Sequence, residues 1–204
     1  MHEKILSHQQ IMNRIFYDID GFEIPKNDEK NVRQSKGSPI YGEINFQSLK
    51  KLIDHLKLNN NDVFYDLGSG VGKVVIQTAL TSPVKKSIGV ELSLMRYQDA
   101  QKALTIAQHF DKTLLSRCNF VNADMLTVDL SDASVIYTCS TAFSEQFMKK
   151  ITSYLASFKQ PFRLVSLQDL PDTKHFTLTE RLKLNMSWAR NTPVYIYQNN
   201  RHKE

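Results

Sequence analysis

Cysteine is scarce in this chain of 204 residues, where Cys118 and Cys139 are the only two. They lie far apart and form no CxxC pair, and no spacing of cysteine and histidine indicates zinc. We therefore expect neither a disulfide framework nor a metal site. A reduced, intracellular environment fits this usage best.

Long hydrophobic runs are missing as well. No stretch approaches the ~20 apolar residues that a membrane span requires, and the first residues lack the apolar segment of a signal peptide. We therefore expect a soluble protein without membrane contact. Its expected location is the cytoplasm, or the nucleus if the host is eukaryotic.

Charge of one sign is only slightly in excess, with 26 Lys and Arg against 21 Asp and Glu and a net charge of +5. The hydrophobic content of 41% is ordinary for a soluble domain with a sizeable core. The basic residues include the clusters Lys50-Lys51, Lys85-Lys86, Lys149-Lys150 and Arg201-His202-Lys203. Such clusters are usually solvated surface, but they are also compatible with a weak contact to nucleic acid.

The hydrophobic pattern predicts alternating strands and helices. An approximately helical pattern covers residues 3–17, a long polar loop is expected at 18–40, and a helix at 46–57. Strands are expected at 62–66, 87–91, 118–122, 134–138 and 162–167, with helices at 72–81, 94–109 and 143–157. This alternation predicts an α/β fold whose mostly parallel sheet carries helices on both faces. The segments 175–184 and 193–198 resemble two strands with too short a link for a crossover helix, so we expect them to pair antiparallel.

A glycine-rich stretch, YDLGSGVGKVV at 65–75, directly follows the first expected strand. A triphosphate-binding loop would need glycine and a hydroxyl residue where the sequence has Leu67 and Val74, so this reading is rejected. A dinucleotide fingerprint would need a third glycine where Lys73 stands, which makes that reading weak. The remaining pattern is DxGxGxG, in which glycines let the backbone turn tightly beside a ligand.

Three acidic residues stand at the ends of consecutive strands and suggest what the loop holds. Asp66 supplies a negative charge that suits an ammonium group and suits a pyrophosphate badly. The cofactor that combines an amino-acid end with a nucleoside and carries no phosphate is S-adenosylmethionine. Glu91, about 20 residues after Gly70, is placed to bind both ribose hydroxyls. Asp124 could accept from the adenine amino group, and Met125 could pack on the ring.

Five segments in a fixed order carry a sharper resemblance: YGEI at 41–44, DLGSGVGKVV at 66–75, GVE at 89–91, SVIYTCSTAF at 134–143 and SWARNTPVYIY at 187–197. This order resembles the catalytic domain of the non-SET histone lysine methyltransferases, the disruptor-of-telomeric-silencing family of class I methyltransferases. The resemblance implies a Rossmann-like sheet of seven strands with an antiparallel C-terminal pair and a helical N-terminal extension. It divides the chain into a helix and cofactor-capping loop at 1–44, a methyltransferase domain at 45–200 and a tail at 201–204.

The resemblance also implies S-adenosylmethionine as cofactor and a protein substrate, a lysine of a histone or another basic protein. Its cofactor site corresponds here to Tyr41, Gly42, Glu43, Ile44, Asp66, Gly68, Ser69, Gly70, Gly72, Lys73, Glu91, Asp124 and Met125. Its catalytic region corresponds to Cys139, Ser140, Phe143, Trp188, Tyr195 and Tyr197. Phe143 and Trp188 would form walls of a lysine channel, with one of the two tyrosines nearby.

Three departures from the family pattern stand out. The family usually carries paired asparagines where this chain has Cys139-Ser140, and commonly glutamine at the position of Lys73. An extra residue between Trp188 and Pro193 shifts which tyrosine would reach the channel. Cys139 is interpreted as a small buried residue rather than a nucleophile, and Ser140 as a group that could bind the methionine carboxylate or orient an amine.

The residues leave three function classes open. In a lysine methyltransferase, an apolar aromatic tunnel lowers the pKa of the incoming lysine, so a dedicated base is optional and the absence of a histidine–acid pair is no obstacle. The Cys139-Ser140 change favours the alternative, a class I methyltransferase for a small molecule or RNA. Methyltransferases that act on adenine amino groups or glutamine amides often carry an Asn/Asp-Pro-Pro-aromatic turn after the fourth strand. The TCST segment has no such turn, so we do not expect DNA adenine or glutamine as the methyl acceptor. The third class is a non-catalytic binding module that has kept the fold.

Overall fold

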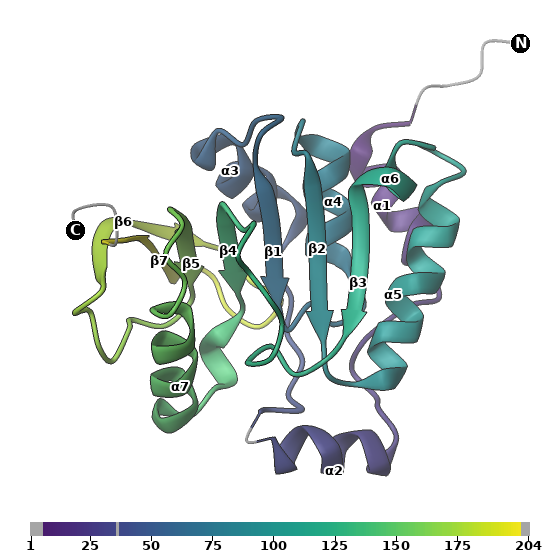
Figure 1. Cartoon of the computed structure of the whole chain (residues 1–204). Helices are drawn as coiled ribbons and strands as arrows, with labels where there is room; N and C mark the ends of the chain where they lie inside the picture. The colour runs from purple at the N-terminus through teal and green to yellow at the C-terminus, as the bar shows by residue number, and fades with distance from the viewer. Residues whose placement is uncertain (1–5, 36, 201–204) are drawn as a thin grey trace, which may run out of the picture.

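A seven-stranded sheet forms the centre of the computed structural model, which describes residues 6–35 and 37–200 (Figure 1). The strands are β1 (Val63–Leu67), β2 (Lys86–Glu91), β3 (Cys118–Asn122), β4 (Val135–Thr138), β5 (Arg163–Ser166), β6 (Phe176–Leu184) and β7 (Thr192–Asn199). Their order in the sheet is β3-β2-β1-β4-β5-β7-β6. The first five strands run parallel, and β7 pairs antiparallel with both β5 and β6. The predicted fold class and the antiparallel C-terminal pair are both confirmed.

Helices cover both faces of this sheet (Figure 1). They are α1 (His8–Ile15), α2 (Lys26–Gln34), α3 (Phe46–Leu56), α4 (Lys73–Thr81), α5 (Leu94–Ala107), α6 (Leu114–Arg117) and α7 (Glu145–Leu155), with a short 3-10 turn at Ser140–Ala142. One apolar cluster lies between the sheet and helices α1, α3, α4 and α5. A second cluster on the opposite face includes the buried side of α7. No described helix is long and apolar enough to cross a membrane.

Local sequence accounts for the central elements. In α3, the residues Leu49, Leu52, Ile53 and Leu56 recur at helical spacing, and all four are buried. All five residues of β1 are buried, as expected for a central parallel strand that is covered on both faces. Because the parallel strands all run in one direction, their carboxyl ends meet at one edge of the sheet, where ligands bind in open α/β folds.

The prediction of a continuous loop at 18–40 is wrong, because α2 occupies part of that segment. Its sequence, KNDEKNVRQ, buries only Val32 and therefore lacks the apolar stripe by which a helix is recognised. A distant contact holds it: Asp28 accepts hydrogen bonds from the Ser93 hydroxyl and the Met95 backbone N–H, each at 2.8 Å. Figure 1 shows α2 beyond the carboxyl ends of β1, β2 and β3. Residues 3–5 of the predicted first helix, and the predicted tail at 201–204, lie outside the described residues.

Candidate cofactor and acceptor site

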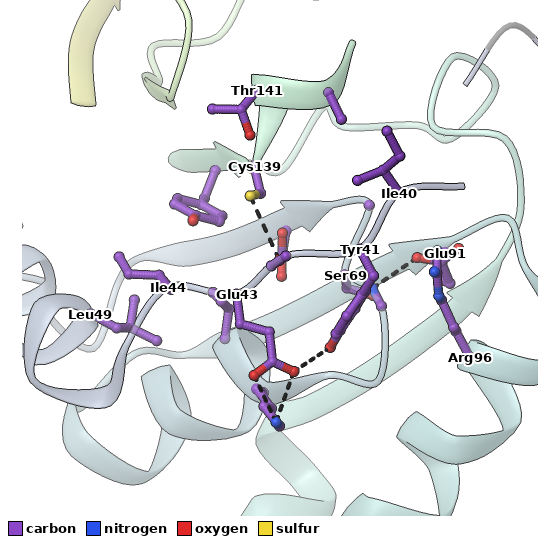
Figure 2. Close-up of a pocket in the computed structure, with 18 of the residues that line it drawn as sticks. Ile40, Tyr41, Glu43, Ile44, Leu49, Ser69, Glu91, Arg96, Cys139 and Thr141 are labelled. Atoms are coloured by element: carbon purple, nitrogen blue, oxygen red, sulfur yellow. Dashed lines mark hydrogen bonds and ion pairs between the residues drawn. The ribbon is translucent and has the colours of Figure 1, made fainter. Parts of the chain in front are cut away.

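A cavity of about 980 Å³ opens at the carboxyl ends of β1, β2 and β4 (Figure 2). Its walls come from the segment before α3, the glycine loop, the strand ends and the loop between β6 and β7. The predicted residues that line it are Tyr41, Gly42, Glu43, Ile44, Asp66, Gly68, Ser69, Gly70, Lys73, Glu91, Asp124, Met125, Cys139, Phe143 and Trp188. Segments that are far apart in the sequence therefore meet in one cavity.

The glycine loop between β1 and α4 is tied to the neighbouring strand. The backbone N–H groups of Gly68 and Ser69 donate to the carbonyl of Val90 at 2.9 and 3.0 Å. Gly70 has a φ of +54°, and a Cβ there would overlap the ring of Tyr41, so the position requires glycine for both conformation and space. Gly72 does not line the cavity, and a side chain there would instead overlap the ring of Phe120.

Asp66 is the penultimate residue of β1 and is almost completely buried, at 2% exposure. Within the described part of the chain its Oδ1 atom has no hydrogen-bond partner, and neither does the buried hydroxyl of Ser69 in the same cavity. Burial raises the pKa of Asp66 well above its usual value, and the nearby Glu91 raises it further. Because a buried anion without a partner is costly, this carboxylate suits a ligand that brings a positive charge and N–H donors.

Glu91, at the end of β2, is satisfied by the backbone. Its Oε2 accepts from the Gly70 N–H and its Oε1 from the Ser93 N–H, both at 2.8 Å. Burial raises the pKa of Glu91, while the backbone N–H groups of Ser93, Gly70 and Leu92 and the Arg96 guanidinium oppose that rise. Each carboxylate oxygen keeps a free lone pair, so Glu91 can hold the glycine loop and still accept from a pair of ligand hydroxyls.

Tyr41, Glu43 and Lys73 form a hydrogen-bonded cluster over the glycine loop (Figure 2). The Tyr41 hydroxyl donates to Glu43 Oε1 at 2.7 Å, and Lys73 Nζ contacts the two carboxylate oxygens of Glu43 at 2.7 and 2.8 Å. Burial and the neighbouring Glu43 raise the pKa of Tyr41 well above its usual value, so the phenol stays neutral and acts as a donor. Lys73, which stands where the family commonly has glutamine, therefore forms an ion pair with Glu43 in this chain.

Arg96 is a site residue that the sequence interpretation missed. It is 4% exposed, and its guanidinium lies 4.9 Å from the Tyr41 ring centre. Its Nε donates to the Gly21 carbonyl at 2.9 Å and its Nη2 to the Pro39 carbonyl at 2.8 Å, which fixes the chain that covers the cavity. Burial lowers the pKa of Arg96, and Glu91 opposes this shift. The available signal was its spacing with the buried residues of α5, which are Ala100, Ala103, Leu104 and Ala107.

Aromatic side chains form the other end of the cavity. The segment before α3 pairs with the loop that carries Trp188: the Ser187 N–H donates to the Glu43 carbonyl at 2.7 Å, and the Ser187 hydroxyl accepts from the Glu43 N–H at 3.1 Å. A side chain at Gly42 would overlap the indole of Trp188. Phe143 meets Phe147 edge to face, with ring centres 5.0 Å apart. Trp188 is 44% exposed and therefore stands at the mouth of the cavity rather than in the core.

Cys139 lies between the two ends of the cavity, with its Sγ 3.8 Å from the Gly42 carbonyl (Figure 2). Burial, followed by the charge of Asp66, raises the pKa of its thiol to about 12. The side chain is therefore a neutral thiol at physiological pH, which agrees with its interpretation as a packing residue rather than a nucleophile.

Three of the predicted catalytic residues lie away from the cavity. The Ser140 hydroxyl is completely buried, where it is 3.0 Å from the Ser166 hydroxyl and accepts from the Leu167 N–H at 3.1 Å. Tyr197 is also completely buried, and its hydroxyl bonds to Asp169. The Tyr195 ring packs against the guanidinium of Arg181. These three side chains stabilise the β5–β7 side of the sheet. Of the predicted catalytic residues, those that line the cavity are Cys139, Phe143 and Trp188.

The remaining sequence predictions concern metal and nucleic acid. The described residues contain no group of His, Cys, Asp and Glu that could hold a metal ion. In the basic pairs, Lys50 bonds to Asp54 at 2.6 Å and Lys149 to Glu145 at 2.7 Å, so these two lysines already have partners. The basic cluster at 201–203 lies outside the described residues.

Solved structures that resemble this one share its fold at low sequence identity. An RNA methyltransferase from Salinibacter ruber in complex with S-adenosyl-L-homocysteine gives a TM-score of 0.59 at 22% identity, over 75% of this chain and 90% of its own. The magnesium protoporphyrin IX methyltransferase from Synechocystis, with bound SAM, gives 0.60 at 14% identity, over 93% and 90%. The fold is therefore the Rossmann-like class I methyltransferase fold.

Sequence relatives are more specific. An H3 lysine-79 specific histone-lysine N-methyltransferase of Caenorhabditis elegans is 34% identical over 67% of this chain and 15% of its own length. A protein-lysine N-methyltransferase of Saccharolobus islandicus is 30% identical over 43% of this chain and 52% of its own. The chain thus spans from about a seventh to about half of the length of these relatives. The family model described as "Histone methylation protein DOT1" matches residues 23–192, which is most of the chain. On this match, the chain belongs to the DOT1 histone methylation protein family.

Proposed function

We propose that this protein is an S-adenosylmethionine-dependent methyltransferase that acts on lysine side chains of proteins. The observation that carries the proposal is the buried carboxylate of Asp66, whose Oδ1 has no partner among the described residues and which faces the cavity at the strand ends. Membership of the DOT1 family supports the reaction class. S-adenosylmethionine carries its methyl group on a positively charged sulfur. Its amino-acid end has an ammonium group, which would serve as the missing partner of the Asp66 carboxylate.

The cofactor roles proposed for the remaining residues follow from their positions. Glu91 is placed to accept from the ribose hydroxyls while it holds the Gly70 and Ser93 backbone. Asp124 and Met125 line the next part of the cavity, after β3, where they suit the adenine. Tyr41 covers the loop and shields it from water, because Arg96 and Glu43 fix its position.

The acceptor end needs to align an amine and exclude water. Phe143 and Trp188 offer apolar walls for the methylenes of a lysine side chain. Such surroundings disfavour the ammonium form, so the amine is presented as a neutral nucleophile without a dedicated base. This fits the lining of the cavity, which includes no histidine among the described residues. Cys139 adds a neutral, weakly polar surface between the two ends.

The substrate class we propose is a basic protein, with histones as the first candidate. This choice is supported by the printed activities of the relatives, which are histone-lysine and protein-lysine methyltransferases. Weak contact with nucleic acid and action in the cytoplasm or nucleus stay predictions from the sequence.

Transfer of label from methyl-labelled S-adenosylmethionine tests the proposal. The acceptors are core histones, assembled nucleosomes and a cell lysate, each incubated with the wild-type chain and with Gly70→Arg. Arginine at this position collides with Tyr41 and should abolish transfer. Thr105→Arg, on the exposed face of α5, is the matched control and should transfer as well as the wild type.

Label on a lysine of a protein, present with wild type and Thr105→Arg and absent with Gly70→Arg, is the expected result. Label on RNA or a small molecule, and on no protein, would contradict a lysine acceptor. It would favour the alternative, a class I methyltransferase for a small molecule or RNA, which the Cys139-Ser140 change also favours. Failure of the wild type to bind S-adenosylhomocysteine in calorimetry would overturn the methyltransferase itself and favour a binding module.

A further inference from the structure

Tyr137 is a buried tyrosine whose hydroxyl lies beside the thiol of Cys139. It lies in β4, is 1% exposed and lines the cavity. Within the described residues its hydroxyl oxygen has no hydrogen-bond partner. The ring stacks near Phe64, with centres 6.4 Å apart, so apolar packing already holds it. A phenylalanine would make the same apolar contacts without burying an unsatisfied hydroxyl.

The position of this hydroxyl relates it to Asp66. Strands β1 and β4 are parallel neighbours in which Asp66 and Tyr137 are register partners, so both side chains leave the same face of the sheet. The described residues contain five buried side-chain atoms without a partner, and three of them, on Asp66, Ser69 and Tyr137, belong to residues that line this cavity. Unsatisfied groups that gather at one cavity indicate a polar ligand there rather than scattered packing defects.

The chemistry of the hydroxyl narrows the ligand group. Burial raises the pKa of Tyr137 well above its usual value, and the neighbouring Cys139 and Asp66 raise it further, so the phenol stays neutral. A neutral phenol can accept from an N–H while it donates to a carboxylate. An ammonium group has three N–H donors, and Asp66 alone does not supply a separate acceptor for each in an ordinary geometry. Cys139, as a thiol, is only a weak acceptor.

We propose that the Tyr137 hydroxyl acts together with the Asp66 carboxylate to recognise the α-ammonium group at the amino-acid end of the cofactor. Tyr137 is then a positioning residue for the methyl donor and not part of the acceptor channel. This inference rests on the proposed function, because it assigns a residue to the cofactor of that same site.

Calorimetric titration with two ligands tests the assignment. The ligands are S-adenosylhomocysteine and its analogue that lacks the amino group but keeps the carboxylate. The proteins are wild type, Tyr137→Phe and the matched control Tyr65→Phe. Tyr65 is a buried tyrosine of the adjacent strand β1, but it belongs to the apolar cluster on the opposite face and its hydroxyl bonds to Asp132 at 2.9 Å. The thermal unfolding of each ligand-free protein is recorded in parallel.

Tyr137→Phe should weaken S-adenosylhomocysteine binding roughly tenfold, because it removes a hydrogen bond to a charged group. Binding of the deaminated analogue should change by less than about twofold, since the group that Tyr137 recognises is missing from it. The ligand-free variant should unfold at the same or a higher temperature than the wild type. Tyr65→Phe should show the reverse, with lower thermal stability and unchanged affinity for both ligands.

Equal weakening of both ligands by Tyr137→Phe would overturn the inference, because the hydroxyl would then bind another group or support the fold. An unchanged affinity for S-adenosylhomocysteine would also overturn it and would leave the proposed function intact. If the wild type bound neither ligand, the proposed function and this inference would fail together.

Discussion

The two ends of β1 carry buried aspartates with opposite surroundings. Asp62, just before the strand, accepts from the Asn59 N–H at 2.8 Å and from the Ser134 hydroxyl at 2.7 Å, and its Oδ1 lies 3.5 Å from Arg163. Asp66, at the carboxyl end, has an oxygen with no partner among the described residues, and its charge is disfavoured by burial. The same residue type on one strand thus serves the fold at one end and is available to a ligand at the other.

This difference separates stability from binding within one sheet. At the amino-terminal edge, the polar groups satisfy one another, so removing one leaves its partners unpaired. At the carboxyl edge, three buried oxygen atoms have no hydrogen-bond partner among the described residues; they belong to Asp66, Ser69 and Tyr137. Glu91 is intermediate, because it binds two backbone N–H groups and retains acceptor capacity. Native proteins accept such unsatisfied groups where function requires them.

The largest expected effect is on ligand affinity at the carboxyl edge. Asp66→Asn removes the negative charge that would bind the ammonium, and we expect S-adenosylhomocysteine to bind about 100-fold more weakly, the cost of a lost charge pair in a buried site. The ligand-free protein should be as stable as the wild type or more so, because the carboxylate has no hydrogen bond to lose among the described residues. Calorimetry and thermal unfolding measure the two quantities. A large loss of stability with unchanged affinity would reverse the comparison.

At the other end of the strand, the same substitution should have the opposite effect. Asp62→Asn places an amide nitrogen against hydrogen-bond donors, because both carboxylate oxygens of Asp62 act as acceptors. We expect the free energy of unfolding to fall by about 2 kcal/mol. Affinity for S-adenosylhomocysteine should stay within about twofold of the wild type, since Asp62 does not line the cavity. Urea unfolding and calorimetry provide the measurements, and a marked loss of affinity would show that the two ends are coupled.

The pH dependence of stability should distinguish the aspartates further. The pKa of Asp66 is raised above its ordinary value of 3.8, so the folded protein keeps a proton that the unfolded chain has released. Unfolding then releases a proton, and the free energy of unfolding falls as pH rises from that ordinary value through the raised one. The slope is at most about 1.4 kcal/mol per pH unit. Asp66→Asn should lack this contribution. Urea unfolding of both proteins over a pH series tests it, and parallel curves would contradict the assignment.

Much of the cavity lining at the strand ends was predictable because it depends on local patterns. Asp66 and Glu91 lie at the ends of strands that are recognisable from their apolar residues, and Gly68 and Gly70 directly follow the first of these strands. Parallel strands bring their carboxyl ends together by topology. Spacing along the chain was therefore enough to place these residues in one cavity. The aromatic residues Phe143 and Trp188 were found through the family resemblance, since an isolated aromatic residue is more often part of a core.

Other features depend on contacts that no local pattern encodes. The helix α2 is polar almost throughout, and the contacts of Asp28 with α5 hold it in place. Tyr195 and Tyr197 were correctly expected to share one face of a strand, but the register of β7 against β5 decides which face that is. It directs both toward the cluster beside α7 rather than into the cavity. Tyr137 was overlooked because in the sequence it is one more residue of an apolar strand. Only the structure shows that its hydroxyl has no partner among the described residues.

The smallest expected effect on affinity and stability concerns the Tyr41–Glu43–Lys73 cluster that covers the glycine loop, rather than the strand ends themselves. Lys73 and Glu43 form an ion pair whose side chains are 30% and 19% exposed. Lys73→Gln removes the charge but keeps an N–H donor for Glu43, so stability should change by less than about 1 kcal/mol and S-adenosylhomocysteine affinity by less than about threefold. Lys50→Gln, which breaks the exposed pair with Asp54, is the matched control for removal of a lysine charge. A tenfold loss of affinity confined to Lys73→Gln would mean that this cluster contributes to ligand binding as the strand ends do. The contrast between the two ends of β1 would then describe only part of the site.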